Sequence, residues 1–319
     1  MSETLIIGDV RDPHIIAVRE SLRRRNRPAY VFSRYDSQCR ITISFGIEQR
    51  PTISVTAGGA SVDCDKISSI WWRPKPFTSF YPSDPERNNA QDFIRREWNH
   101  VLGCLPAFFS HAKWINPIDK ALVASGKPVG LGLAAQAGFK IPRTAFTNDI
   151  QVVSAARENY AVVYKTLHGY LAPDSQTIFT TRIGKDHLLN ATEIGIAPAI
   201  YREQIEKLFE VRIYFIHDTV FTIKIDSQGN PSTRQDWRED QYLDIHELIE
   251  TDPSWKHKVI TYSKLSGLAY GAIDAIVTPT GELVFLECNP AGQWLWQEKA
   301  TGAPIAAAIA QSLSCTRDV

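Results

Sequence analysis

The chain has 319 residues, of which 44% are hydrophobic and 22% charged, and its 35 acidic residues balance 35 lysines and arginines. At about 100–200 residues per domain this length predicts two or three domains, and the composition excludes disorder, collagen and a small disulfide scaffold. A net charge of zero argues against a nucleic-acid partner, because non-specific binding needs a surplus of basic residues.

Cysteine usage and apolar runs indicate an intracellular protein. The five cysteines are scattered and lack C-x-x-C spacing, which predicts reduced thiols rather than a metal or redox site. The apolar run at 5–7 is too short for a signal peptide, and no run approaches the roughly 18–20 residues of a membrane span. We therefore expect a soluble, cytoplasmic protein without a membrane partner.

The first third of the chain predicts an α/β unit in which strands alternate with helices. Strands are expected at 4–7, 41–45, 53–56 and 67–72, and helices at 13–24 and 95–105. An arginine cluster at the end of the first helix comprises Arg19, Arg23, Arg24, Arg25 and Arg27. It is typical of a solvated helix end, where cations complement the dipole, and a polyanion patch is the alternative.

The rest of the chain changes from helical to strand-rich patterns. Helices are expected at 120–124 and 128–137, with Gly138 ending the second, followed by strands at 161–165 and 176–182. Two hairpins are expected, 210–216 with 220–225 and 272–277 with 282–288, separated by a polar loop at 227–244. Further helices are expected at 257–268 and 303–313.

The last predicted hairpin carries the strongest chemical signal. Glu287 and Asn289 project to one face of a strand, and the tight turn brings Asp274 opposite them. Two carboxylates and an amide oxygen are hard ligands that suit Mg²⁺ held with a nucleotide's phosphates. The alternative is that each carboxylate pairs with a lysine or arginine of the chain, since a carboxylate beside an apolar core needs a cation.

Other motifs are less specific. Residues 130–135 fit a dinucleotide fingerprint, but no strand precedes them, so the small residues predict close helix packing. Lys165 ends a predicted strand, where it can reach phosphate as a point charge or be an ordinary surface lysine. No complete P-loop, G-x-S-x-G or H-E-x-x-H motif occurs.

In this order and spacing the motifs resemble the ATP-grasp superfamily, and within it the microviridin-type (graspetide) peptide ligases. Lys127 precedes a helix and Gly-Phe-Lys-Ile-Pro at 138–142, and Arg-Glu-Gln-Ile at 202–205 stands where relatives have their hinge. The peptide-ligase branch is indicated by Asn-Pro-Ala-Gly-Gln-Trp-Leu-Trp at 289–296, by Ser-Gln at 227–228 with Asp-Trp-Arg at 236–238, and by Trp-Trp-Arg-Pro at 71–74. Arg202, Gln204 and Lys75 depart from the family's usual residues.

The resemblance implies an α/β (α+β) ATP-grasp fold. It places an N-terminal pre-ATP-grasp α/β domain at 1–117, a small central α+β domain at 118–202 and a strand-rich C-terminal α+β domain with the metal site at 203–319. ATP and Mg²⁺ are the implied cofactors. The implied residues are Lys127, Lys165, Glu203, Gln204, Ile205 and Glu210 for ATP, Asp274, Glu287 and Asn289 for the metal, and Arg212, Arg234 and Lys165 for catalysis.

The implied activity is ADP-forming ligation within a ribosomal precursor peptide that has a leader and a Thr/Ser- and Asp/Glu-rich core. An Asp or Glu carboxylate becomes an acyl phosphate, and a Ser/Thr hydroxyl or Lys amine displaces phosphate to close a ring. The peptide-binding candidates are Arg73, Lys75, Asp236, Trp237 and Arg238, with a structural role as the alternative for the basic ones. A homodimer is implied. The alternatives are a ligase that adds free amino acids and a non-catalytic peptide binder.

Overall fold

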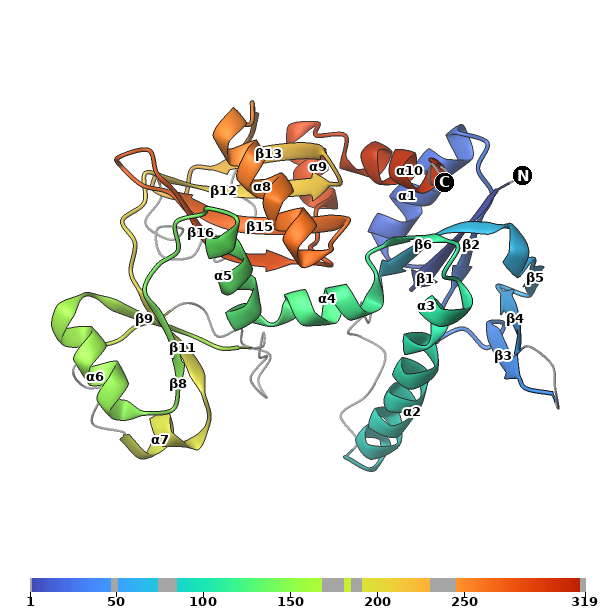
Figure 1. Cartoon of the computed structure of the whole chain (residues 1–319), viewed down its shortest axis with the longest axis horizontal. Coiled ribbons are helices and arrows are strands. Elements are labelled where there is room, and N and C mark those ends of the chain that lie inside the picture. Colours follow the sequence, from blue (N-terminus) through green and yellow to red (C-terminus); the bar gives the residue numbers. More distant parts are fainter. Residues whose placement is uncertain are drawn as a thin grey trace.

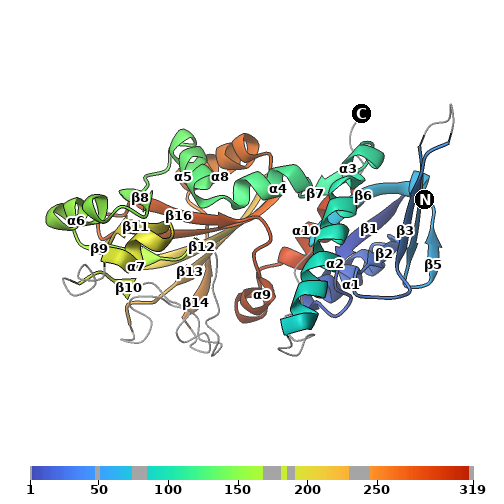
Figure 2. The same ribbon diagram turned by 90° about the horizontal axis from the view of Figure 1, so that it is seen from below.

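The computed structural model describes residues 2–46, 51–73, 85–167, 181–184, 191–229 and 245–315. The described residues form four β-sheets with helices, which confirms the predicted mixed α/β class. The central and N-terminal sheets lie on opposite sides of a larger C-terminal sheet (Figure 1 and Figure 2). No described helix combines the length and apolar character that crossing a bilayer requires.

The N-terminal sheet is parallel and has the order β2-β1-β6-β7. Its strands are β1 (Glu3–Gly8), β2 (Ala29–Phe32), β6 (Ile67–Arg73) and β7 (Lys113–Ile115). One face packs against α1 (Pro13–Arg24) and α10 (Ile305–Ser314), and the other against α2 (Pro85–Gly103) and α3 (Leu105–Phe108). A small antiparallel sheet of β3 (Arg40–Ser44), β4 (Thr52–Ala57) and β5 (Ala60–Val62) extends this second core.

The central sheet is antiparallel and has the order β10-β9-β11-β8. Its strands are β8 (Thr144–Thr147), β9 (Val162–Lys165), β10 (Thr181–Arg182) and β11 (Ala199–Glu203). Val153 of α6 (Ile150–Asn159) packs on Val162 and Tyr201, with α7 (Ala191–Ile196) beside it. The opposite face of this sheet is therefore left for contacts with other parts of the chain.

The C-terminal sheet is antiparallel and has the order β14-β13-β12-β15-β16. Its strands are β12 (Phe209–Ile216), β13 (Thr219–Ile225), β14 (His246–Ile249), β15 (Tyr270–Val277) and β16 (Leu283–Asn289). Helices α5 (Lys127–Gln136) and α8 (Pro253–Ser266) cover one face, on which Val211, Ile213 and Phe215 of β12 are buried. The alternate residues Glu210, Arg212 and Tyr214 consequently point to the other face, near α9 (Leu295–Thr301).

Most long elements lie where the periodicity predicts them. Both hairpins are confirmed, and Gly130 lies in α5 close to the Tyr262 hydroxyl of α8, as expected for small residues in helix packing. All five cysteines are free, as predicted. The helix predicted at 257–268 begins earlier because the Asp252 side chain accepts hydrogen bonds from the amides of Ser254 and Trp255 and caps it.

Short elements were missed by the periodicity. They are β2, β5, β7, β8, β11, β14, α3, α6, α7 and α9. A strand of three to five residues shows too few alternations to be distinguished from a loop, and α9 follows a Trp-rich stretch without a helical period. Residues 176–180 of one predicted strand and 230–244 of the predicted polar loop lie outside the described residues.

Asn116 joins the end of the N-terminal sheet to the C-terminal sheet. Its side chain is 2% exposed and donates to the carbonyls of Tyr270 and Pro290 at 2.9 and 2.8 Å. Its oxygen accepts from the amides of Ala269 and Tyr270, both at 2.8 Å. Asn116 lies just before helix α4 (Ile118–Ser125), and these bonds satisfy backbone groups at the start of strand β15 and directly after strand β16.

We therefore expect Asn116→Ala to destabilise the protein by about 3 kcal/mol, because it leaves several buried backbone groups without partners. Urea unfolding followed by tryptophan fluorescence measures the loss. Asn148→Ala is the matched control, since exposed Asn148 makes one side-chain bond, to the Gly195 carbonyl at 3.1 Å. Equal unfolding midpoints for the two variants would contradict the proposed junction.

Candidate active site

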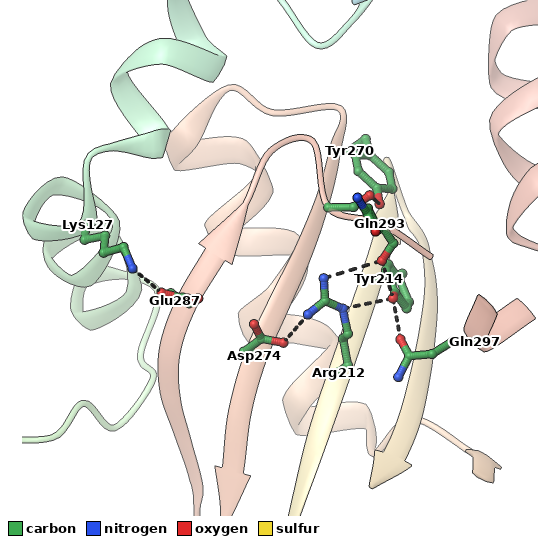
Figure 3. A network of polar contacts seen from close by, with 9 residues as sticks. Lys127, Arg212, Tyr214, Tyr270, Asp274, Glu287, Gln293 and Gln297 are labelled. Carbon is green, nitrogen blue, oxygen red and sulfur yellow. Dashed lines mark hydrogen bonds and ion pairs between the residues drawn. The ribbon is translucent and has the colours of Figure 1, made fainter. Parts of the chain in front are cut away.

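Two carboxylates and two cations meet on the open face of the C-terminal sheet (Figure 3). Asp274 of β15 and Glu287 of β16 are directly opposite each other in the register of the two strands. The Arg212 Nη1 donates to Asp274 Oδ1 at 2.8 Å, and the Lys127 Nζ to Glu287 Oε2 at 2.9 Å. All four side chains are between 11% and 24% exposed, so the cluster is accessible but largely desolvated.

A β-bulge in β16 precedes Glu287. Asp274 pairs with Glu287 but Ala275 pairs with Phe285, which makes Leu286 the extra residue of β16. Phe285 therefore stays in the core beneath α5 and α8, while Glu287 reaches the opposite face. Asn289 lies opposite Ala272, one pleat further along the face of Asp274. The structure thus brings the three predicted metal ligands onto neighbouring strands.

The charges in the cluster support one another. Burial opposes the charge of Arg212, but the Asp274 carboxylate, together with Tyr214 and Tyr270, outweighs burial and raises the pKa of Arg212 above its ordinary value of 12.5. Burial raises the pKa of the Cys288 thiol, which stays protonated between Glu287 and Asn289. Cys288 packs against the core of α5 and α8, so it does not belong to the ligand set.

The chemistry of this donor set fits Mg²⁺. Among the described residues no group of three or more His, Cys, Asp or Glu side chains is suited to a metal, which argues against an all-protein cage. Magnesium needs fewer protein ligands, because it is usually held by one or two carboxylates together with substrate phosphates. Asp274 and Glu287 supply such a pair, and the Asn289 side-chain oxygen, which accepts from the Ala291 amide at 3.0 Å, lies beside it.

The central sheet turns its uncovered face toward β16. Lys165 ends β9 opposite Ile200, so both project away from the core under α6. Arg202 shares that face, is 4% exposed, and donates to the carbonyl of Leu286 in the bulge at 3.1 Å. Burial lowers the pKa of Arg202, and the nearby Glu287 charge opposes this shift. Arg202 therefore links the central sheet to the strand that carries Glu287.

The predicted hinge, residues 202–205, lies at the end of strand β11. The amides of Glu203 and Gln204 donate to the carbonyls of Arg143 and Ala161, both at 2.8 Å, so these two donors are used within the sheet. Glu203 Oε2 accepts from the Arg143 amide at 3.3 Å, and Ile205 is half-buried after it. Glu210 lies on the Arg212 side of β12, where Lys207 donates to it at 2.8 Å.

Comparison with known proteins identifies the arrangement. No family model and no curated protein sequence matches the chain. Among solved structures, a ligase from Chryseobacterium gregarium, described as a RiPP-associated ATP-grasp ligase and solved with ADP and a leader and core peptide, is 25% identical with a TM-score of 0.85 over 98% of this chain and 96% of its own. The macrocyclase MdnC from Microcystis aeruginosa MRC, bound to precursor peptide MdnA, is 25% identical with a TM-score of 0.80, over 97% of this chain and 99% of its own.

The chain has the fold of graspetide-type ATP-grasp ligases and is similar to them over nearly its whole length. The ATP-grasp ligase PsnB shares the fold with a TM-score of 0.75 at 22% identity, over 98% of this chain and 96% of its own. The likeness covers nearly the whole chain, so the N-terminal, central and C-terminal sheets are parts of one ligase fold.

Arg73 of this ligase pairs with a carboxylate other than Asp274 and Glu287. It is 2% exposed and its Nε donates to Asp12 Oδ2 at 2.6 Å, which favours the structural role that the sequence left as the alternative. Burial works against ionisation of Asp12, but hydrogen bonds from His14 and the charge of Arg73 hold its pKa well below its ordinary value. His14 in turn accepts from the Trp294 amide at 3.1 Å, which ties the pair to the 289–296 segment.

The remaining predicted residues lie outside the described part of the chain. They are Arg234, Lys75, Asp236, Trp237 and Arg238. Conversely, sequence reasoning missed Asp12, His14, Tyr214 and Gln297, and noted Arg202 only as a departure from the family. Their signal was weak because none of them belongs to a recognisable motif, and only the fold shows their partners. Asp12 caps α1, His14 lies in α1, Tyr214 in β12 and Gln297 in α9.

We expect Arg73→Met to destabilise the ligase by about 3–5 kcal/mol, because it leaves the Asp12 charge buried without its cation. The double variant D12N/R73M should recover part of this loss. Because the pKa of Asp12 is lowered in the fold, the pair stabilises fully above the ordinary value of 3.8 and its contribution declines as the pH falls. Urea unfolding at pH 7 measures the effect.

Arg23→Met is the matched control, since Arg23 pairs with Glu20 at 2.9 Å on the exposed side of α1. Exposed pairs contribute little, so this variant should keep the wild-type midpoint. A purely peptide-gripping role for Arg73 would instead leave the stability of R73M unchanged and weaken only peptide binding.

Proposed function

We propose that the ligase uses ATP to join side chains within a ribosomally made precursor peptide, forming a macrocycle, ADP and phosphate. The observation that carries this proposal is the opposed Asp274–Glu287 pair with Lys127 and Arg212 beside it. It is supported by the likeness to the Chryseobacterium gregarium ligase, which holds ADP and a leader and core peptide. The acidic residues of such a core supply the carboxylate to be activated.

In the first step, a side-chain carboxylate oxygen of the peptide attacks the γ-phosphorus of ATP, and the bond to the β-phosphate oxygen breaks. The products are an acyl phosphate and ADP. Catalysis of phosphoryl transfer is mainly positioning and charge neutralisation. The family resemblance supports these roles for the chain's residues: Lys127 and Lys165 hold phosphates, residues 203–205 hold the adenine and Glu210 the ribose. Arg212 and Arg234 stabilise charge on the transferring phosphoryl group and the acyl oxygens.

In the second step, a Ser or Thr hydroxyl, or a Lys amine, of the same peptide attacks the acyl carbon. The carbon–oxygen bond to phosphate breaks, inorganic phosphate leaves and the nucleophile loses one proton, giving an ester or an amide. A Mg²⁺ ion bound by Asp274, Glu287 and Asn289 would supply Lewis-acid neutralisation of the phosphate charge. The buried Arg212 keeps its proton throughout, because its pKa is raised.

Mass spectrometry of the enzyme with ATP, Mg²⁺ and the peptide encoded beside its gene tests the proposal. The expected outcome is loss of one water per crosslink with equimolar ADP. A gain in mass would identify a ligase that adds free amino acids, and peptide binding without nucleotide turnover would identify a non-catalytic binder. Formation of AMP would exclude the acyl-phosphate mechanism. Thr, Ser and Lys variants of the core then distinguish ester from amide closure.

We expect Glu287→Gln to abolish ADP formation, because it removes one of two carboxylates at the proposed magnesium site. The substitution keeps the size of the side chain, so thermal unfolding should remain close to wild type. A coupled assay for ADP, run across a Mg²⁺ titration, provides the measurement. Wild-type turnover at low Mg²⁺ would refute the role of Glu287 in metal binding.

We expect Lys127→Met to raise the KM for ATP by roughly 10- to 100-fold, since one charge-assisted hydrogen bond contributes about 1.5–3 kcal/mol. Lys140→Met is the matched control. Lys140 pairs at 2.6 Å with Glu282, an exposed carboxylate directly before β16, the strand that carries Glu287. The KM for ATP of this control should not change. Equal effects in both variants would show that charge loss in general, and not a phosphate contact, is responsible.

We further propose domain limits of 1–117, 118–202 and 203–319, a cytoplasmic location and a homodimer, as the family resemblance implies. Light scattering coupled to size exclusion tests the dimer, with a mass near twice 35.9 kDa as the expected result. Limited proteolysis tests the domain limits, and cleavage near residues 117 and 202 would support them.

A further inference from the structure

On the side away from Asp274, Arg212 is held by a buried chain of polar groups (Figure 3). Its Nη1 faces Asp274, whereas its Nε donates to the Tyr214 hydroxyl at 2.9 Å and its Nη2 to the Gln293 carbonyl at 3.4 Å. Each nitrogen of the guanidinium thus has a partner, and the three partners lie in different directions. A planar guanidinium held at three points cannot rotate without breaking at least one bond.

Tyr214 is itself fixed. Its side chain is fully buried, and its ring lies beside the guanidinium of Arg212, 5.6 Å from the guanidinium carbon. The hydroxyl contacts the Gln293 carbonyl at 2.9 Å and the side-chain oxygen of Gln297 in α9. Burial, only partly offset by Arg212, raises the pKa of Tyr214 to about 12, so the phenol keeps its proton at neutral pH.

The phenol has one proton for two acceptors, which defines what Gln297 does. The Gln297 amide nitrogen is buried and has no partner among the described residues. If the amide is turned about its last bond, that nitrogen donates to Tyr214 while Tyr214 donates to the Gln293 carbonyl. In both arrangements a lone pair of the hydroxyl oxygen still points to Arg212 Nε, so the clamp is retained.

The loop before α9 fits this clamp closely. A Cβ atom at Gly292 would lie 2.4 Å from the Ala272 Cβ and 3.3 Å from Arg212 Nη2, so only glycine lets the backbone approach the guanidinium. Tyr270 holds the same loop by donating to the Gly292 carbonyl at 2.8 Å, but its hydroxyl makes no bond to Arg212. The loop therefore contacts the catalytic arginine through its backbone.

We infer that Tyr214, supported by Gln297, is a positioning residue that fixes the guanidinium plane of Arg212, and that residues 292–297 serve this purpose. The inference rests on the proposed role of Arg212 in stabilising the transferring phosphoryl group. A guanidinium in the wrong plane still attracts phosphate, but it does not match the developing charge. The clamp therefore acts on turnover more than on binding of either substrate.

Tyr214→Phe tests the clamp against Tyr270→Phe as the matched control. Each variant removes one buried hydroxyl that binds the same loop, but only Tyr214→Phe removes the acceptor of Arg212 Nε. We expect kcat for ADP formation to fall roughly 10- to 100-fold in Y214F, with the KM for ATP nearly unchanged and a much smaller change in Y270F. Equal losses in both variants would reduce Tyr214 to a structural residue.

A double-mutant cycle separates the clamp from an independent effect of Tyr214. In an Arg212→Lys background, Y214F should change kcat by less than about twofold, because the group it positions is gone. The full wild-type loss in that background would overturn the inference. Gln297→Met, which keeps the volume and removes the amide, should reproduce a smaller part of the Y214F loss in the wild-type background and none in Arg212→Lys.

The Nε–H resonance of Arg212 gives a readout that needs no substrate. In protein with ¹⁵N-labelled arginine, this resonance is assigned by its disappearance in Arg212→Lys. Slow hydrogen exchange is expected in wild type and Y270F, and fast exchange in Y214F. Slow exchange in Y214F as well as in wild type would refute the clamp. Slow exchange in wild type and fast exchange in Y214F, in an enzyme that forms no ADP, would refute only the proposed function.

Discussion

The β-bulge at Leu286 is the constraint on which the active-site face depends. Without the extra residue, Phe285 and Glu287 would lie on one face of β16, so either the ring would leave the core or the carboxylate would enter it. Arg202 from the central sheet donates to the bulge carbonyl and thereby fixes this local geometry to a second sheet. Strand β16 can therefore place Phe285 in the core under α5 and α8 and still present Glu287 on the opposite face.

Both cations of the site are also positioned by distant packing. Lys127 is the first residue of α5, a helix that packs on the opposite face of the sheet yet begins beside the edge strand β16. Arg212 is clamped by the loop before α9, and that loop is tied to the N-terminal sheet because His14 accepts from the Trp294 amide. The site consequently depends on the N-terminal, central and C-terminal sheets, although Arg212, Asp274 and Glu287 all lie on the C-terminal one.

Sequence reasoning located what is periodic or carries an unusual residue type. The hairpins with Asp274 and Glu287, the helix that starts at Lys127 and the strand that ends at Lys165 all have patterns long enough to recognise. Tyr214 could not be distinguished from a core tyrosine, because its strand reads as an apolar run and the partner Gln297 is 83 residues away. Arg73 was a candidate for peptide binding with a structural role as the alternative, and only the fold shows that Asp12 neutralises it in the core.

Two interpretations of the carboxylates that looked exclusive in the sequence are compatible in the fold. Asp274 and Glu287 do pair with an arginine and a lysine of the chain, as the alternative to metal binding required. Yet Arg212 and Lys127 are the residues to which the resemblance assigns the phosphates, so the pairs gather both signs of charge around one place. Each cation then offsets part of the desolvation cost of the neighbouring carboxylate. A magnesium nucleotide also carries both signs of charge, so it matches the cluster better than a single ion would. The two cations and two carboxylates of the cluster thus balance each other in charge, as the 35 acidic and 35 basic residues do over the whole chain.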